Sequence, residues 1–213
     1  MVDLLFHSLF QTLLMVIVSL MIGIVGGCAL GTLLYTIGSQ GLRPKPYLYK
    51  VLSFGVNSVR SIPYIILIVL LIPFTRLLVG SSIGTWAAIV PLSLAAILLI
   101  ARATEDTFKN IPKGLIEMGI SLGASSRQII LKIIFPEALS LLIDQITSIT
   151  ITLIGFSAMA GTVGGGGLGD LAIRYGYQRY EILFMVVIVL VLLGLVQTVQ
   201  IIGALCARRY RYC

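Results

Sequence analysis

The chain contains several long stretches without a formally charged residue, and these stretches constrain its fold more than any other feature. Residues 4–42, 77–101, 145–169 and 182–207 contain no Asp, Glu, Lys or Arg. A helix needs roughly 20 mostly apolar residues to cross the hydrocarbon core of a bilayer. Of the 213 residues, 58% are hydrophobic and 11% are charged, which excludes a soluble, disordered or nucleic-acid-binding protein. The sequence therefore predicts an all-α integral membrane protein.

We expect five membrane-spanning helices in a single transmembrane domain that covers residues 1–213. The spans are predicted at about 8–37, 52–74, 83–103, 141–161 and 182–206. The second span contains Arg60, followed closely by Pro63. We place Arg60 near a helix end, where its guanidinium can reach the lipid headgroups, and the sequence assigns it no further role. In the first span, Gly23, Gly27 and Gly31 lie on one helix face and predict close helix packing.

The basic residues indicate how the chain is oriented. If the amino terminus lies outside the cell, twelve of the fifteen Lys and Arg residues face the inside. Only Arg76, Arg174 and Arg179 then face the outside. Cytoplasmic loops of membrane proteins carry an excess of basic residues. We therefore predict that the carboxyl terminus lies inside, where the cluster Arg208–Arg211 anchors the last span beside anionic headgroups.

No pattern of residues predicts catalysis or cofactor binding. The chain has one histidine, no clustered carboxylates within a span and no phosphate-binding loop, and its three cysteines lack the spacing of a metal or disulfide site. The tract Gly164–Gly169 fits a dinucleotide-binding pattern formally, but it follows a predicted membrane span rather than a strand. We predict no catalytic residue, no metal and no cofactor. A stand-alone channel or carrier and a membrane scaffold remain alternatives.

The segment of about 104–140 is the only long hydrophilic stretch, and its local signals predict a cytoplasmic helical hairpin. Asn110 can cap a first helix, with Pro112 in the opening turn and Gly123 at its end. Ser125 and Gln128 form an S-x-x-Q capping box for a second helix, which Pro136 limits or kinks. The isoleucines at 129, 130, 133 and 134 give this helix an apolar face that needs a partner surface or the membrane underside.

A motif in this hairpin resembles the EAA signature of ABC importer permeases, which reads E-A-A, three residues, G, nine residues, I-x-L-P. Here Glu117-Met118-Gly119 is followed by Gly123 and by Ile133-Ile134-Phe135-Pro136 at the same spacing. Met118 and Gly119 replace the two alanines, and Phe135 replaces the leucine. The resemblance implies a coupling helix, here Lys113–Leu122, that sits in a groove of a cytoplasmic ATPase. The implied coupling residues are Lys113, Glu117, Met118, Gly119, Gly123, Ile133 and Pro136.

Other segments are similar to the methionine-importing members of this family: Arg60–Tyr64, Ile72–Arg76 with Gly84-Thr85, and Gly155–Gly169. The resemblance implies a type I ABC importer permease of the bacterial inner membrane. Two copies of the chain would form the pathway as a homodimer with two cytoplasmic ATPase subunits, which bind ATP and magnesium, and an external solute-binding protein. The chain itself would not be an enzyme. It would import L- or D-methionine by alternating access, and another small amino acid or solute is the alternative.

Several residues are candidates to line the pathway or to gate it. We expect Tyr64, Ser157 and Met159 to line it, although core packing is an alternative for each of them. The tract 161–169, which includes Gly164 and Gly166, is predicted to form, together with Tyr175–Tyr180, an outer gate and the docking surface for the solute-binding protein. Its glycines permit tight backbone turns.

Overall fold

The computed structural model describes residues 2–210, and every regular element in this range is helical. Arg211 of the predicted basic cluster and Cys213 lie outside the described residues. The elements are α1 Val2–Ile37, α2 Pro46–Arg60, α3 Tyr64–Val79, α4 Thr85–Lys109, α5 Lys113–Ser121, α6 Ser126–Ile129, η1 Ile130–Ile134, α7 Phe135–Thr162, α8 Gly167–Leu171, η2 Ala172–Gln178 and α9 Ile182–Tyr210.

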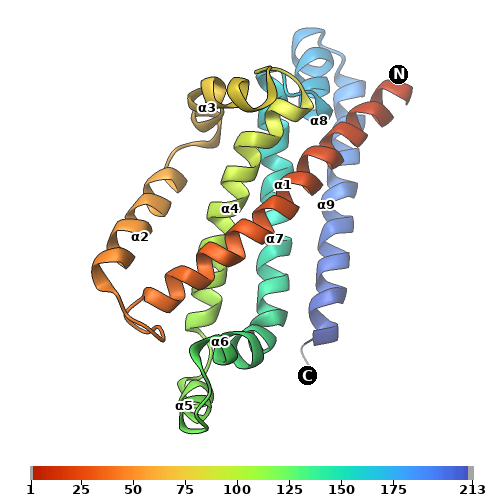
Figure 1. Ribbon diagram of the computed structural model, residues 1–213. Coiled ribbons are helices and arrows are strands. Elements are labelled where there is room, and N and C mark those ends of the chain that lie inside the picture. Colours follow the sequence, from red (N-terminus) through yellow and green to blue (C-terminus); the bar gives the residue numbers. More distant parts are fainter. Residues whose placement is uncertain (1, 211–213) are drawn as a thin grey trace.

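Helices α1, α4, α7 and α9 form the bundle, and α1 crosses α4 along a seam of small residues (Figure 1). Gly23, Gly27 and Gly31 are buried in this seam, as their spacing predicts. A Cβ atom on Gly23 would lie 2.6 Å from the Ala96 Cβ, and one on Gly27 would lie 2.7 Å from the Ile100 Cβ. The glycines therefore set how closely the two helix backbones approach.

The second predicted span is not one straight helix. It consists of α2 and α3, which are bent by 106° at residues 61–63. The break has a local cause, because the ring of Pro63 disfavours helical geometry at the preceding residue and removes a backbone N–H donor. In Figure 1, α2 runs along the side of the bundle and α3 turns across its upper end. Arg60 is the last residue of α2, so it lies at a helix end as predicted, directly beside the break.

Length and composition identify fewer spans than the five we predicted. Within residues 2–210, the helices α1, α4 and α9 are long and apolar enough to cross a membrane, and the bent pair α2 and α3 makes four if it forms one broken span. Helix α7 is not in this set, and polar residues such as Asp144, Gln145 and Thr147 interrupt its apolar sequence. The count of five remains a prediction.

The hairpin departs from the predicted boundaries at two residues. Asn110 does not cap the first hairpin helix; it is the C-terminal cap residue of α4, and Pro112 precedes α5 instead. Pro136 does not end the second helix, because it lies in the first turn of α7. The π-helical segment η1 joins α6 to α7 without a break, so the hairpin continues directly into a long helix of the bundle.

Candidate functional site

Helix α5 projects from the lower end of the bundle in Figure 1 and exposes most of its side chains. Gly123 adopts a left-handed φ of 76° and closes the turn after α5, and the capping box of Ser125 and Gln128 forms as predicted. Of the predicted coupling residues, Lys113, Glu117, Met118, Gly123 and Pro136 are exposed, Ile133 is half-buried and Gly119 is buried.

The exposed surface of α5 is apolar as well as charged. Met118, Ile120 and Leu122 are exposed by 52%, 56% and 79% on a hairpin that extends beyond the bundle. Exposed apolar residues clustered on one element are typical of an interaction surface. Glu117 lies beside them and forms no ion pair with another described residue.

The isoleucine face of the second hairpin helix packs against the bundle. Ile129 and Ile134 are buried with Tyr35, Phe108 and other residues in one apolar cluster. A Cβ atom on Gly119 would lie 2.7 Å from the Ile133 Cδ1, so the glycine lets α5 pack closely against η1. The apolar face therefore needs neither a partner surface nor the membrane underside, because the chain's own bundle covers it. The hairpin is therefore a packed extension of α4 and α7.

A buried charge cluster near the lower end of α4 ties α2 to α4. Glu105 is fully buried, accepts a hydrogen bond from the Tyr49 hydroxyl at 2.8 Å, and pairs with Lys109 at 2.6 Å and with Arg102. Arg102 also donates to the Ser53 carbonyl oxygen of α2 at 3.1 Å. The sequence analysis missed this cluster, although the spacing of Arg102, Glu105 and Lys109 places all three on one helix face.

The three predicted pathway residues of α3 and α7 have different surroundings in the structure. Tyr64 is buried and stacks on Phe156, with ring centroids 4.2 Å apart and planes inclined by 4°. Ser157 is buried, and its hydroxyl donates to the Ile154 carbonyl oxygen of its own helix, so it faces the packed interior. Met159 is 45% exposed. It lies on a face of α7 that also exposes Ser148, Thr152 and Gly155.

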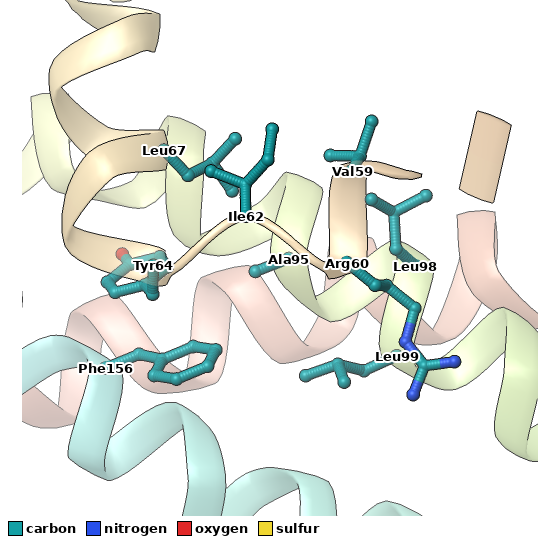
Figure 2. Close-up of a pocket in the computed structure, with 9 residues that line it drawn as sticks. All are labelled: Val59, Arg60, Ile62, Tyr64, Leu67, Ala95, Leu98, Leu99 and Phe156. Carbon is teal, nitrogen blue, oxygen red and sulfur yellow. The ribbon is translucent and has the colours of Figure 1, made fainter. Parts of the chain in front are cut away.

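Tyr64 and Phe156 line a small cavity of about 50 Å³ at the break between α2 and α3 (Figure 2). The rest of its wall is apolar apart from Arg60, whose side chain runs beside Leu99. The Tyr64 hydroxyl is buried without a hydrogen-bond partner in the described part of the chain. A buried polar group without a partner costs free energy and calls for an explanation.

The glycine tract is held in place by α1. Gly166 and Gly167 both adopt positive φ values, and the side chains of Gln11 and Thr12 accept hydrogen bonds from the backbone N–H groups of Gly167 and Leu168, at 2.8 and 2.9 Å. Gly164 also has a positive φ, and its carbonyl oxygen accepts a hydrogen bond from the Gly84 N–H at 2.9 Å. The tract therefore connects α1, α4 and α7 at the upper end of the bundle.

The comparisons with known proteins agree with this architecture. The family described as "binding-protein-dependent transport system inner membrane component" matches residues 23–212. The chain is 47% identical over 207 residues to a probable D-methionine transport system permease protein of Vibrio cholerae, which covers 97% of this chain and 92% of that protein. It is 46% identical over 158 residues to the D-methionine transport system permease protein of Escherichia coli K12, covering 74% and 73% of the two chains.

A solved structure described as an inward-facing conformation of the MetNI methionine ABC transporter contains a chain with a TM-score of 0.96 and 43% identity to this one, covering 98% of this chain and 97% of the other. A chain from an amino acid ABC transporter with histidines has a TM-score of 0.79 at 20% identity, which supports the fold alone. The family match covers most of the sequence, and the Vibrio cholerae relative is similar over nearly the whole length of this chain. This chain belongs to the family of binding-protein-dependent transport system inner membrane components.

Proposed function

We propose that this chain is the permease subunit of an ATP-driven methionine importer. The observation that carries the proposal is the similarity over nearly the full length, 47% to a D-methionine permease and a TM-score of 0.96 to a chain of a methionine ABC transporter. The residues 1–213 form a single transmembrane domain of five spans, with α7 as the fourth and the amino terminus outside the cell.

The permease works as a homodimer with two cytoplasmic ATPase subunits and an external solute-binding protein. The ATPase subunits bind ATP and magnesium, so the permease is not an enzyme. The exposed apolar and charged surface of α5 docks into the ATPase groove. When ATP closes the ATPases, the hairpins move and carry α4 and α7 with them.

Import is tested by reconstituting the chain in proteoliposomes with its ATPase and its solute-binding protein. Labelled L-methionine and D-methionine are supplied outside, with ATP inside. We expect accumulation of at least one stereoisomer that depends on ATP and on the binding protein. Flux that persists without ATP or without the binding protein would instead identify a channel or a carrier. Accumulation of another amino acid in place of methionine would overturn the substrate assignment.

The coupling role of α5 is tested with Glu117→Lys, which reverses an exposed charge beside the apolar residues of the hairpin. We expect uptake to fall about tenfold or more while ATP hydrolysis by the complex becomes independent of substrate, because the reversed charge alters the electrostatic fit of α5 to the ATPase groove. Glu137→Lys is the matched control, since Glu137 is an exposed acid in the first turn of α7 and outside α5. Equal loss of uptake in both variants, or normal coupling in Glu117→Lys, would contradict the proposed role.

A further inference from the structure

The importer function described above does not use the charge cluster of Arg102, Glu105 and Lys109. Glu105 is fully buried and Arg102 is 8% exposed, so both charges are withdrawn from water. Removing two charges from water costs free energy, and apolar residues of similar volume often give equal or greater stability. Stability alone therefore does not explain why the chain buries this pair.

The cluster holds α2 at two points that are one helical turn apart. The Tyr49 hydroxyl donates to the Glu105 Oε1 at 2.8 Å. The Arg102 guanidinium donates to the Ser53 hydroxyl and, at 3.1 Å, to the Ser53 carbonyl oxygen. Tyr49 and Ser53 are four residues apart, so both contacts lie on one face of α2. Because hydrogen bonds are directional and apolar contacts are not, these contacts fix the rotation of α2 and its position along its axis.

Apart from the loop that joins it to α1, α2 is held against the bundle by a narrow contact. All 15 residues of α2 are described, and only Val56 among them is buried. Val56 packs in one apolar cluster with Leu34 and Leu98. The contact is therefore apolar at Val56 and polar at Tyr49 and Ser53.

The same charge cluster adjoins the hairpin. Lys109 pairs with Glu105 at 2.6 Å and is the last residue of α4, so only residues 110–112 separate it from α5. The preceding residue, Phe108, is buried in one apolar cluster with Ile129 of the hairpin. The end of α4 and the hairpin thus pack together, and a movement of the hairpin reaches the charge cluster directly.

The burial of the cluster favours α2 moving together with α4 rather than separating from it. If α2 moved away, Glu105 would lose the Tyr49 hydroxyl and Arg102 would lose Ser53. Buried polar and charged groups that lose their partners carry a large penalty in free energy. The contact between the two helices is therefore expected to stay closed while the hairpin moves.

We propose that the charge cluster, with Tyr49 and Ser53, is a rigid link that makes α2 follow the hairpin when the ATPases close. Lys109 and Glu105 receive the movement, and α2 carries it to the break at residues 61–63 and the start of α3. These side chains act through the position of α2, so they are positioning residues for transport. The inference rests on the proposed function and adds a second route from the hairpin to the upper end of the bundle, beside α4 and α7.

Tyr49→Phe tests the rigid link and removes only a hydroxyl, so Glu105 keeps its pairs with Lys109 and Arg102. In proteoliposomes with ATPase and solute-binding protein, we expect the methionine imported per ATP hydrolysed to fall about threefold or more, because α2 then follows the hairpin incompletely. Tyr47→Phe is the matched control, since Tyr47 lies on the same helix and is 83% exposed. A merely structural role would lower the unfolding temperature without changing the methionine imported per ATP.

A covalent tether between α2 and α4 provides the second measurement. Val59 and Leu98 line the same cavity and lie beside each other in Figure 2. Val59→Cys and Leu98→Cys are combined in a background without the native cysteines, and a short bifunctional methanethiosulfonate reagent joins the two thiols. Gel mobility identifies any cross-link between copies of the chain, and the single-cysteine variants control for the reagent.

We expect the tethered complex to import methionine within about twofold of the untethered complex, because α2 and α4 need not separate. The tether should also restore the methionine imported per ATP when Tyr49→Phe is added, since it replaces the lost hydrogen bond as a connection between the helices. Size-exclusion chromatography checks that each complex is assembled.

Three results would overturn the rigid link: normal methionine import per ATP in Tyr49→Phe, no restoration by the tether, or import that the tether blocks and a reducing agent recovers. If the wild-type complex imports methionine and any of these results is found, only the rigid link is wrong. If the wild-type complex imports no methionine, the proposed function fails, and the link fails with it. The two failures are therefore distinguishable.

Discussion

Some glycines in this chain adopt backbone conformations that other residue types rarely adopt. Gly166 has φ of 80° and ψ of −163°, a region that essentially only glycine occupies. Its neighbour Gly167 donates its N–H to Gln11, so the conformation of one residue fixes how the tract meets α1. The sequence analysis assigned the glycines to tight turns, and the positive φ values confirm this. It could not identify Gln11 as the partner, because 156 positions separate it from Gly167.

Gly166→Val tests whether this geometry matters for transport. A Cβ atom on Gly166 would lie 2.8 Å from the Gln11 Oε1, and valine would be strained by about 1–3 kcal/mol at this φ and ψ. We expect a lower unfolding temperature in detergent and reduced uptake in proteoliposomes. Gly194→Val is the control, because a Cβ atom on Gly194 would meet nothing within 4 Å. Uptake by Gly166→Val that equals uptake by the control would contradict a gating role for the tract.

Helix pairs in this bundle are joined in two different ways, by small residues and by buried charge. The spacing of the glycines in α1 predicted a packing face, and only the structure shows that α4 covers it. Local signals also predicted the turn at Gly123 and the capping box at Ser125, because those signals act within a few residues. The predicted cap at Asn110 was wrong because α4 extends to Lys109. The helix does not end at Pro136, because the π-helical segment η1 continues into α7.

Gly27→Val tests the packing of α1 on α4. The added side chain would meet the Ile100 Cβ at 2.7 Å and the Ile97 carbonyl oxygen at 2.8 Å, so the two helix backbones must separate. Overpacking of this kind costs about 1–3 kcal/mol. We expect a lower midpoint in thermal unfolding followed by size-exclusion chromatography, and little change in Gly194→Val. An unchanged midpoint for Gly27→Val would show that the seam is looser than the structure indicates.

Glu105→Gln tests the charge cluster that joins α2 to α4. The substitution leaves the buried Arg102 guanidinium without its counter-ion and weakens the contact to Lys109. Breaking a buried pair by removing one partner costs about 3 kcal/mol or more. Asp106→Asn is the matched control, because the Asp106 side chain is 68% exposed and its pair with Lys109 at 3.9 Å contributes little. Equal unfolding temperatures for the two variants would contradict a structural role for the buried cluster.

Across the whole molecule, the amino end of α1 and the hairpin lie at opposite ends of the bundle (Figure 1). Helix α9 ends on the same side as the hairpin, where the Ser140 hydroxyl donates to the Ala207 carbonyl oxygen at 3.2 Å. The uncharged stretches and the basic residues were sufficient to predict a helical membrane protein with this arrangement. They could not predict the 106° break, because Arg60 and Pro63 reveal a weak point in a span but not the direction of the next helix.

The proposed orientation is tested with single cysteines in a background that carries Cys28→Ser, Cys206→Ser and Cys213→Ser. Ser121→Cys places a thiol on the exposed surface of α5, and Gln178→Cys places one on the exposed end of η2. Because the hairpin must meet a cytoplasmic ATPase, we expect a membrane-impermeant maleimide to label Gln178→Cys in spheroplasts and Ser121→Cys only in inverted vesicles. The opposite pattern would contradict the basic-residue argument. It would also put α5 on the wrong side of the membrane for any contact with ATPase subunits.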